Sequence, residues 1–390
     1  MTTSRIPAAR FAERIAAARA ETAKAGLDAL LVGVGADLRY LAGYEALPLE
    51  RLTLLVVPAR ADAPVTLIAP RLEVTPARTC PAAVTGAVEI ATWEETEDPM
   101  ALVASLLEAA TGFPAAAVGS VAVSDGLRAA FVLGLQRVLP AARFTLVSGV
   151  LRALRMCKDE DEVALLRDAA HAADRVVLAV ASGPLVGRTE ADVAREVRER
   201  LVAEGHDHAE FWIVASGPNS ASPHHEPGER VIAAGEPIVI DIGGQLGGYG
   251  SDITRTVWVT GGDPAKGPVK EFLDLYLVLQ HAQAAATAAV RPRTTCERID
   301  AIARTLIADA GYGPFFFHRT GHGIGLEGHE DPYIVAGNGE IMAEGMAFSV
   351  EPGIYLEGRF GARIEDIVVC GEDGPVVLNQ APRDLLVVGG

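Results

Sequence analysis

The carboxylates best suited to chemistry are those that interrupt apolar, strand-like stretches. Asp241 stands in one such stretch and Asp252 in the next, on either side of a glycine-rich turn. If the turn closes as a hairpin centred between Leu246 and Gly247, the two aspartates lie directly opposite each other, with Cβ atoms roughly 5 Å apart. Opposed like charges destabilise a sheet, so this pair predicts carboxylates that are protonated, solvated or neutralised by cations.

The same arrangement recurs nearer the C-terminus. Glu351 and Glu365 lie in two further strand-like stretches, and a hairpin centred on Gly358 would place them opposite each other. A histidine-rich segment, residues 318–330, precedes them, and within it His322 is flanked by glycines that allow close backbone approach. Four carboxylates and one imidazole form a ligand set that suits Mn²⁺, Co²⁺, Fe²⁺ or Zn²⁺.

Each of these features also has a simpler interpretation. A single aspartate in an apolar strand is more often an edge or turn residue than a ligand, and a glycine-rich stretch with histidines is more often a loop. Residue types and spacing leave these interpretations open. The repeated pairing of carboxylates favours a metal site.

The elements that must position these residues can be predicted from the hydrophobic pattern. We expect helices at residues 8–25, 159–181, 189–205, 269–290 and 296–310, strands at 29–34, 52–57, 65–68, 211–214, 237–242, 251–259, 346–350 and 362–369, and further apolar runs at 99–110 and 126–135. Asp159 is a suitable N-cap for the second helix, with Glu162 completing a capping box. The sequence changes in character just before Asp159, which predicts two domains, residues 1–155 and 156–390.

Composition restricts the class of protein. The chain has 390 residues, with 34 Lys+Arg against 51 Asp+Glu and a formal net charge of −17. This acidic balance argues against a nucleic-acid binder and against a polybasic membrane-surface protein. No apolar run approaches the roughly 18 residues of a transmembrane helix, and the N-terminus lacks the apolar core of a signal peptide. Four widely spaced cysteines form no zinc pattern, which favours free thiols in a reducing cytoplasm.

At these residues the sequence resembles the pita-bread metallopeptidases, in particular the Xaa-Pro dipeptidase (prolidase) and aminopeptidase P branch. The motifs that carry the resemblance are Ser216–His225, Asp241–Gly243, Ser251–Thr256, Gly321–Leu326, Glu351–Gly353 and Arg363–Asp366. The resemblance implies an α+β protein, in which a C-terminal pita-bread (creatinase/aminopeptidase) fold follows a smaller α/β creatinase-type N-terminal domain. The N-terminal part is similar only in layout.

The resemblance further implies a site for two divalent metal ions in each subunit, with Mn²⁺ expected first and Co²⁺ or Zn²⁺ as alternatives. The implied ligands are Asp241, Asp252, His322, Glu351 and Glu365. Asp252 and Glu365 would each bridge both metals. Creatinases share the fold without this ligand set, and some binding modules on the fold lack metals altogether. The retained ligand types argue against both.

Catalytic roles follow from the same resemblance. Glu351 would accept a proton from the attacking water, His329 would stabilise the oxyanion, and His224 would steady the leaving nitrogen. Outside the resemblance, Phe211 and Trp212 could line a pocket for an apolar side chain, although at least one of them is expected to pack in the core.

Substrate-binding roles are implied for His318, Arg363 and Tyr333. His318 resembles a residue lining a proline pocket, and Arg363 could orient a carboxylate or bind that of the substrate. Tyr333 stands about where some prolidases have an arginine for the C-terminal carboxylate, so strict dipeptide specificity is in doubt. Thr254 and Tyr355 are candidates for hydrogen-bonding partners of the ligands.

The function expected from this resemblance is hydrolysis of the peptide bond before proline, in dipeptides or short peptides with proline at the second position. A homodimer is implied by the resemblance alone. Two alternatives remain. The chain could act on a non-peptide substrate, as an amidinohydrolase, an ectoine-type amidohydrolase or a sulfonium lyase, or it could be a non-catalytic binding module.

Overall fold

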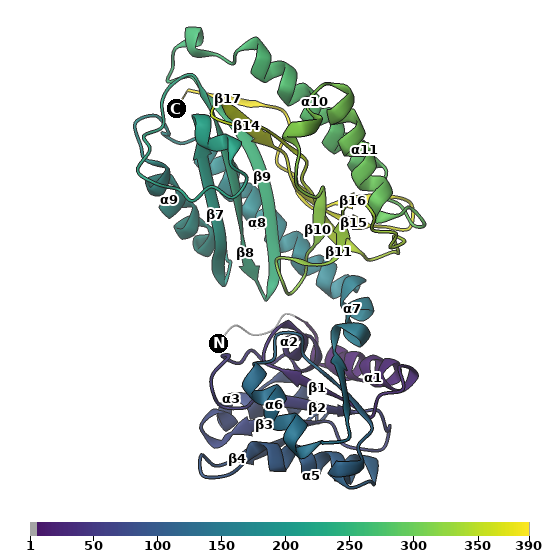
Figure 1. Cartoon of the computed structure of the whole chain (residues 1–390). Coiled ribbons are helices and arrows are strands. Elements are labelled where there is room, and N and C mark those ends of the chain that lie inside the picture. Colours follow the sequence, from purple (N-terminus) through teal and green to yellow (C-terminus); the bar gives the residue numbers. More distant parts are fainter. Residues whose placement is uncertain (1–5, 390) are drawn as a thin grey trace. The chain divides into compact units, whose positions relative to one another are not determined.

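The computed structural model describes residues 6–389. The chain forms two compact units, of which the first ends at Arg155 and the second begins at Met156. Figure 1 shows the order of their helices and strands. No helix within the described residues combines the length and the apolar character needed to cross a membrane.

The N-terminal unit is built on one six-stranded sheet of order β4-β3-β2-β1-β5-β6. Its strands are β1 (Ala29–Gly33), β2 (Leu54–Pro58), β3 (Thr66–Pro70), β4 (Glu89–Trp93), β5 (Ser120–Val123) and β6 (Arg143–Leu146). Its helices are α1 (Ala8–Lys24), α2 (Ala36–Ala42), α3 (Val74–Arg78), α4 (Pro81–Val84), α5 (Pro99–Thr111) and α6 (Ala129–Val138), followed by α7 (Ser148–Met156). Strand β2 pairs antiparallel with both neighbours, and the outer pairs are parallel. The sheet is therefore mixed.

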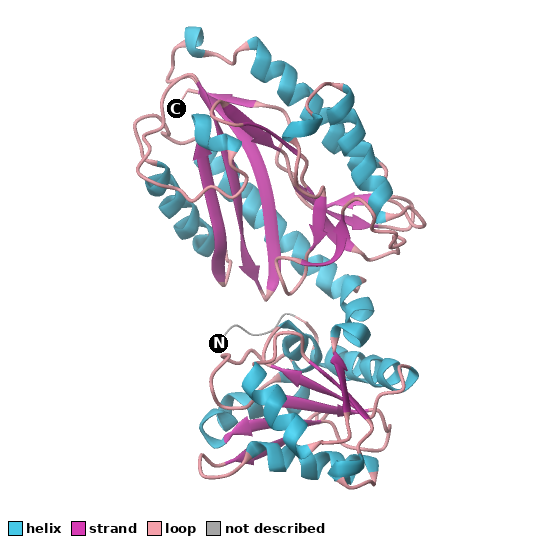
Figure 2. Ribbon diagram, in the orientation of Figure 1, coloured by secondary structure: helices cyan, strands magenta, loops and turns pink. Residues whose placement is uncertain are grey.

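The C-terminal unit contains a four-stranded sheet, β17-β9-β8-β7, a five-stranded sheet, β11-β10-β12-β15-β16, and the pair β13-β14. The strands are β7 (His208–Ser216), β8 (Glu236–Leu246), β9 (Tyr249–Val259), β10 (Gly321–Gly323), β11 (Glu330–Ile334), β12 (Ala347–Val350), β13 (Gly353–Leu356), β14 (Phe360–Arg363), β15 (Asp366–Cys370), β16 (Pro375–Val377) and β17 (Leu386–Val388). The helices are α8 (Glu160–Ala181), α9 (Glu190–Ala203), α10 (Lys270–Ala288) and α11 (Cys296–Asp309). Helices lie outside the strands in this unit (Figure 2).

Two hydrophobic cores hold these layers together. One joins α8 and α9 to the sheet of β7, β8 and β9, through residues such as Val177, Val197 and Ile240. The other joins α10 and α11 to β12–β15, through residues such as Phe272 and Phe348. Burial of apolar surface on these faces is the main force that positions the strands between the helices.

Local sequence signals explain where the site-bearing elements begin and end. Asp159 and Glu162 form the expected capping box at the start of α8, since each side chain accepts a hydrogen bond from the backbone of the other residue. Thr189 caps α9 in a similar way by accepting from the Asp192 amide. The strand expected at 362–369 is instead two strands, β14 and β15, because the chain changes its antiparallel partner from β13 to β12 there.

Candidate metal centre

Asp241 and Asp252 stand on the β8–β9 hairpin, whose register differs from the expected one. The turn consists of Gly247 and Gly248, which both have positive φ, 57° and 88°. Such two-residue turns match the twist of the flanking strands and require φ values that glycine adopts easily. The hairpin is therefore centred between the two glycines, one residue later than predicted.

The shift changes how the two aspartates meet. Asp241 pairs with Thr254. Asp252 pairs with Gly243, where a Cβ would collide with the Ser251 carbonyl oxygen and the Phe211 ring. The prediction that the aspartates lie directly opposite each other is therefore wrong. They are diagonal neighbours on the same face, because a shift of two residues along one strand preserves the side to which a residue points.

The second hairpin has the predicted register. Pairing on both sides of the gap, β12 with β15 and β13 with β14, is centred on Gly358, which has a φ of 72°. Glu351 and Glu365 fall in the break between the two ladders, after the pair of Val350 with Asp366. They are thus carried on irregular backbone that regular pairing holds at both ends.

His322 lies in the short strand β10, between glycines that have no space for a side chain. A Cβ at Gly321 would collide with the Ser349 carbonyl, and one at Gly323 with that of Asp331. The Nδ1 atom of His322 lies 3.2 Å from the Gly323 carbonyl oxygen. With the proton on Nδ1, the Nε2 lone pair is directed at the carboxylates, the arrangement of a metal-ligating histidine.

The ligand atoms converge as a metal site requires. One atom each from Asp252, His322 and Glu365 lies within 4.8 Å of the others. His322 Nε2 is 3.6 Å from Asp252 Oδ2 and 3.4 Å from Glu351 Oε1. Oδ1 of Asp241 is buried and accepts no hydrogen bond from any described residue. An unsatisfied carboxylate oxygen beside three further carboxylates is a site that divalent cations would complete.

The electrostatics support the same conclusion. Burial raises the pKa of Asp252 well above its usual value, and the charges of Asp241 and Glu351 raise it further. Burial and the Asp252 charge act in the same way on the pKa of Glu365. Burial raises the pKa of Glu351 to about 7. The protein alone therefore does not compensate these negative charges.

The pKa of His322 shifts in the opposite direction: burial, followed by the neighbouring His329, lowers it to about 3. The imidazole is therefore neutral at physiological pH, as a metal ligand must be.

Arg363 is buried and holds Asp241 in place. Its Nη2 donates to Asp241 Oδ2 at 2.5 Å and to the Pro223 carbonyl at 3.2 Å. Its Nη1 donates to the Tyr355 hydroxyl at 2.7 Å, and its Nε to Thr254 Oγ1 at 3.1 Å. All three guanidinium nitrogens of Arg363 thus donate to acceptors within the protein. Of the two expected roles, orienting a carboxylate and binding that of the substrate, these contacts correspond to the first.

Thr254 and Tyr355 also contact other site residues. The Thr254 hydroxyl donates to Glu365 Oε2 at 2.6 Å. The Tyr355 hydroxyl lies 3.0 Å from Nε2 of His318.

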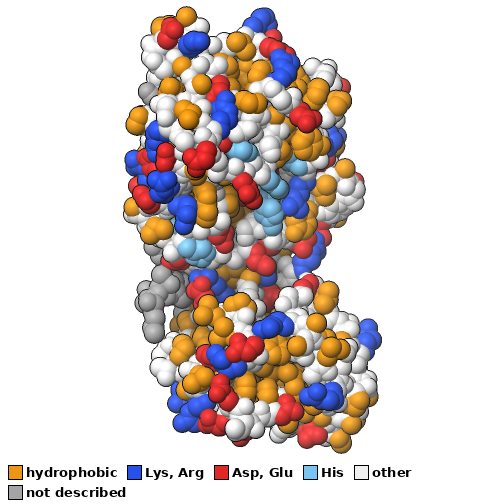
Figure 3. Space-filling model, turned by 60° about the vertical axis from the view of Figure 1, so that its left-hand side comes forward, with side chains coloured by type: hydrophobic (Ala, Val, Ile, Leu, Met, Phe, Trp, Pro, Cys, Tyr) orange, Lys and Arg blue, Asp and Glu red, His pale blue; other side chains and the backbone are white. Residues whose placement is uncertain are grey.

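A cavity of about 720 Å³ opens onto these residues. It is lined by Phe211, Ser222, Pro223, His224, Asp241, Asp252, Phe317, His318, Arg319, His322, His329, Glu351, Arg363 and Glu365. Figure 3 shows histidine side chains gathered on one face of the C-terminal unit. Every predicted site residue except Tyr333 lines this cavity.

Phe211 lines the cavity, whereas Trp212 packs elsewhere. The guanidinium of Arg198, from α9, lies 4.4 Å from the centre of the Trp212 ring. Neighbouring side chains on a strand point to opposite faces, which explains the division between the two aromatic residues.

Arg319 is the residue that the sequence reasoning missed. Its guanidinium stacks over the Tyr333 ring at 4.6 Å from the centroid, and Nη2 lies 3.2 Å from Nδ1 of His329. It forms no ion pair with any residue in the described part of the chain, although it lines a cavity rich in carboxylates. Tyr333 is not among the described residues that line the cavity, and its ring packs against the Arg319 guanidinium instead. Arg319 lies three residues before His322, a predicted metal ligand. This proximity in the sequence was the available signal that Arg319 belongs to the site.

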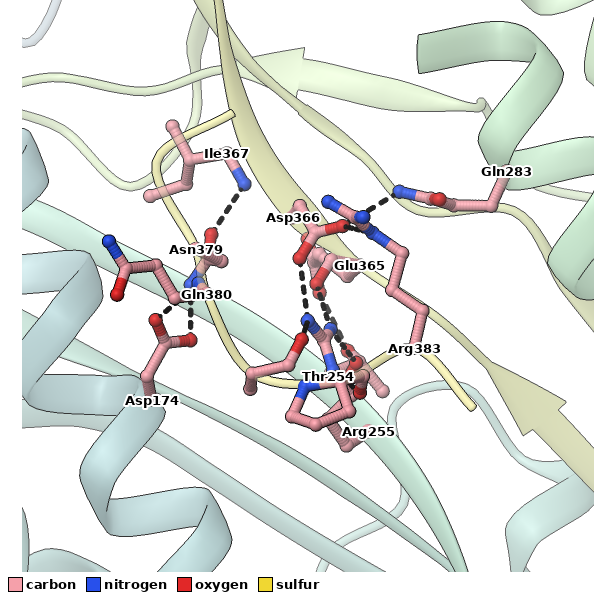
Figure 4. Close-up of polar contacts among 12 residues, drawn as sticks. Asp174, Thr254, Arg255, Gln283, Glu365, Asp366, Ile367, Asn379, Gln380 and Arg383 are labelled. Atoms are coloured by element: carbon pink, nitrogen blue, oxygen red, sulfur yellow. Dashed lines mark hydrogen bonds and ion pairs between the residues drawn. The ribbon is translucent and has the colours of Figure 1, made fainter. Parts of the chain in front are cut away.

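A buried polar network fixes the strands that carry the ligands (Figure 4). Arg255 donates to the Glu365 carbonyl at 2.6 Å and to Asp366 Oδ1 at 2.7 Å. The other oxygen of Asp366 accepts from Gln283 at 2.9 Å and from Arg383 at 2.5 Å. Because Arg255 belongs to β9 and Asp366 to β15, the pair ties the strand of Asp252 to the segment that presents Glu365.

Comparison with known proteins places both units. Residues 164–372 match the model of metallopeptidase family M24, and residues 14–157 match that of the creatinase/prolidase N-terminal domain. The chain is 46% identical to a probable dipeptidase PepE of Mycobacterium tuberculosis over 389 residues, covering 100% of this chain and 99% of that protein. It is 34% identical to an Xaa-Pro dipeptidase of Lactobacillus helveticus over 356 residues, covering 90% and 92%.

Solved structures of dipeptidases and prolidases have the same fold as this chain. Dipeptidase PepE from Mycobacterium ulcerans superimposes with a TM-score of 0.89 at 46% identity, covering 97% of this chain and 98% of that one. A prolidase from Thermococcus sibiricus superimposes with a TM-score of 0.85 at 35% identity, covering 96% and 98%. The expected combination of a creatinase-type N-terminal domain and a pita-bread domain is confirmed. The chain belongs to metallopeptidase family M24.

Proposed function

We propose that this metallopeptidase is a dinuclear exopeptidase that hydrolyses the Xaa-Pro peptide bond of dipeptides or short peptides. The observation that carries the proposal is the convergence of Asp252, His322 and Glu365 in one cavity, beside the unsatisfied oxygen of Asp241. Similarity to Xaa-Pro dipeptidases supports the choice of bond.

The metal ions would be held by five residues: Asp241, Asp252, His322, Glu351 and Glu365. When bound, they would supply Lewis-acid polarisation of the scissile carbonyl and a water acidic enough to act as a nucleophile near neutral pH. Glu351 faces the cavity and would accept the proton of that water. Arg363 would hold Asp241 in its ligating orientation through the 2.5 Å hydrogen bond.

The cavity histidines would act on the reacting bond. The rings of His322 and His329 have centroids only 3.8 Å apart, so His329 can reach a carbonyl oxygen held at the metal ligands. A hydrogen bond donated there would stabilise the oxyanion. His224 would act at the leaving nitrogen, and the ring of His318 with that of Phe317 would form an apolar wall for proline, since both line the cavity.

The guanidinium of Arg319, which forms no ion pair with any described residue, supports a preference for dipeptides. A dipeptide presents its C-terminal carboxylate one residue beyond the scissile bond, and a guanidinium binds a carboxylate in a planar, two-point geometry. Arg363 cannot readily supply this contact because its donors are used within the protein. We therefore assign the substrate carboxylate to Arg319.

Further expectations on the metal, the oligomeric state, the location and the partners belong to the proposal. A carboxylate-rich ligand set favours Mn²⁺, with Co²⁺ or Zn²⁺ as alternatives. We also expect a homodimer, located in the cytoplasm, with a small peptide as its substrate and no nucleic-acid or membrane partner.

A substrate-length series tests the proposal. The chelated enzyme is reloaded with Mn²⁺, Co²⁺ or Zn²⁺ and assayed on Gly-Pro, Ala-Pro, Ala-Pro-Ala and Ala-Ala. Metal-dependent cleavage of Ala-Pro but not Ala-Ala is the expected result, and confinement to dipeptides would identify the prolidase branch. Absence of Xaa-Pro cleavage with every metal would contradict the proposed function.

A further inference from the structure

Glu190 is a fully buried carboxylate far along the chain from the proposed ligands. It occupies the first position of α9, and its side chain has no exposed surface. Its oxygens accept hydrogen bonds from Ser216 N and Oγ, both at 2.7 Å, from Asn219 Nδ2 at 3.0 and 3.1 Å, and from His225 Nε2 at 2.7 Å. All three donor residues belong to one segment, residues 216–225, which we call the 216–225 loop.

The loop ends in a tight turn that presents His224 to the cavity. The His225 amide donates to the Ser222 carbonyl at 3.3 Å, which closes a β-turn with Pro223 and His224 at its centre. Proline restricts φ at the second position, so the turn has little freedom of its own. The Pro223 carbonyl is held by Arg363, and His225, at the far end of the turn, is held by Glu190.

His224 itself has no comparable restraint. Its side chain is exposed on the cavity wall, and its ring forms no hydrogen bond or ion pair with any residue that the structure describes. The described contacts therefore fix only the backbone of the turn, which sets the direction of the Cα–Cβ bond from which the imidazole projects. The next residue along the chain, His225, has a side chain that a hydrogen bond to Glu190 holds in place.

The charge of Glu190 suits this task. Burial alone would raise its pKa, but hydrogen bonds from Ser216, His225 and Asn219 outweigh burial and lower the pKa below its ordinary value. The carboxylate therefore remains an ionised acceptor at neutral pH. Hydrogen bonds to ionised acceptors are about twice as strong as those between neutral groups.

We propose that Glu190 is a positioning residue for the reaction, and that it acts through His225 to hold the turn that aims His224 at the substrate. The inference rests on the proposed peptidase function. It assigns no contact between Glu190 and the substrate. Loss of the tether would let the turn relax, and a misplacement of about 1 Å can reduce the rate about 100-fold.

The first test compares two histidine variants. In metal-loaded enzyme, His225→Ala should lower kcat for Ala-Pro about 10- to 100-fold, with less change in KM. The control is His208→Ala on β7, since His208 forms only an exposed pair with Glu210 at 3.8 Å. The control should retain wild-type kcat, and an equal loss in both variants would overturn the proposal.

A double-mutant cycle separates positioning from general weakening of the fold. In a His224→Ala background, adding His225→Ala should cause no further loss of kcat, because the residue that the tether positions is already absent. Glu190→Gln should show the same dependence on His224 wherever it folds. A loss that is the same with and without His224 would overturn the inference.

A crystal structure of the His225→Ala variant gives an answer that does not depend on any substrate. Displacement of the His224 ring by about 1 Å or more, with the metal ligands unmoved, supports the proposal. An unmoved His224 overturns it. If the wild-type enzyme cleaves no Xaa-Pro peptide, the proposed function fails, and this structure still decides whether Glu190 positions His224.

Discussion

Glu365 and Asp366 are neighbours in the chain and are both buried, yet their carboxylates have opposite surroundings. Asp366 accepts hydrogen bonds from Arg255 at 2.7 Å, Gln283 at 2.9 Å and Arg383 at 2.5 Å (Figure 4). Two of these donors carry a positive charge. The protein itself therefore compensates the negative charge of Asp366.

Among the described residues, the Glu365 carboxylate accepts a hydrogen bond from Thr254 and otherwise faces the carboxylates of Asp252 and Glu351. Its raised pKa records the lack of compensation. Adjacent residues on extended backbone point to opposite sides, so a single step along the chain separates a structural anchor from a proposed metal ligand. The difference between the two carboxylates teaches that a buried carboxylate without a positively charged partner in the protein indicates that a cation from outside the chain binds there.

The cavity arginines show the same contrast with the opposite sign. Arg363 uses its three nitrogens on protein acceptors, including Asp241. Arg319 has an aromatic ring beneath it and a histidine beside it, but no described carboxylate lies within ion-pair distance of it. We interpret the first as part of the scaffold and the second as a receptor for the substrate.

The largest expected effect comes from breaking the anchor. Asp366→Asn should lower the free energy of unfolding of the metal-free protein by about 3–5 kcal/mol, because Arg255 then stays buried beside a neutral amide. Urea denaturation measures the change. Asp274→Asn, which removes an exposed ion pair with Lys270, is the control and should have no measurable effect. Similar shifts in both variants would mean that Asp366 is not an anchor.

Changing the neighbouring residue, Glu365, should not destabilise the metal-free protein. Glu365→Gln removes a repelled charge, so the metal-free protein should be as stable as the wild type or more so. Bound metal and Xaa-Pro cleavage should both fall, the cleavage by at least about 100-fold, since even partners of metal ligands contribute 10- to 100-fold. Elemental analysis and kinetics provide the two measurements. Full metal content in this variant would exclude Glu365 as a ligand.

Arg319→Gln sharpens the comparison of the arginines. The variant should raise KM for Ala-Pro about 10-fold, the loss of one charge-assisted contact, and leave hydrolysis of Ala-Pro amide unchanged. Arg359→Gln, at an exposed pair with Glu271, serves as the control. An equal effect on the acid and the amide would show that Arg319 does not read the carboxylate.

A last effect concerns pH in the metal-free protein. The folded state raises the pKa of Glu351 from 4.5 to about 7 by burial, so between these values it binds a proton that the unfolded chain releases. Stability should therefore fall as pH rises from 4.5 to about 7. The fall should be smaller in Glu351→Gln, as measured by urea midpoints. A rise in stability across this window, specific to the wild type, would contradict the prediction.

Local signals were predictable where one short segment contains all the information. The capping box of Asp159 with Glu162 and the register of the hairpin around Gly358 depend on neighbouring residues, and both are confirmed. The predicted register of the first hairpin is wrong by one residue, because a turn at Leu246–Gly247 and a turn at Gly247–Gly248 are almost indistinguishable in the local sequence. Only the fit of both strands to the sheet chooses the turn of Gly247 with Gly248.

Long-range contacts were beyond such reasoning. The stacking of Arg319 on Tyr333 and the reach of Glu190 to His225 join residues from separate elements. No periodicity or motif spacing encodes which of two arginines lacks a carboxylate partner.

The sequence by itself determined the types of the proposed ligands, the family resemblance and the approximate positions of the long helices and of several strands, because these depend on residue chemistry and local periodicity. Only the tertiary structure decided that Asp241 and Asp252 meet diagonally, that Arg363 is committed to the protein, and that Arg319 lines the cavity without an ion pair to any described residue. The physical reason is that burial and charge compensation are set by every element packed around a group. A partner missing from the fold can be recognised only once the fold is complete.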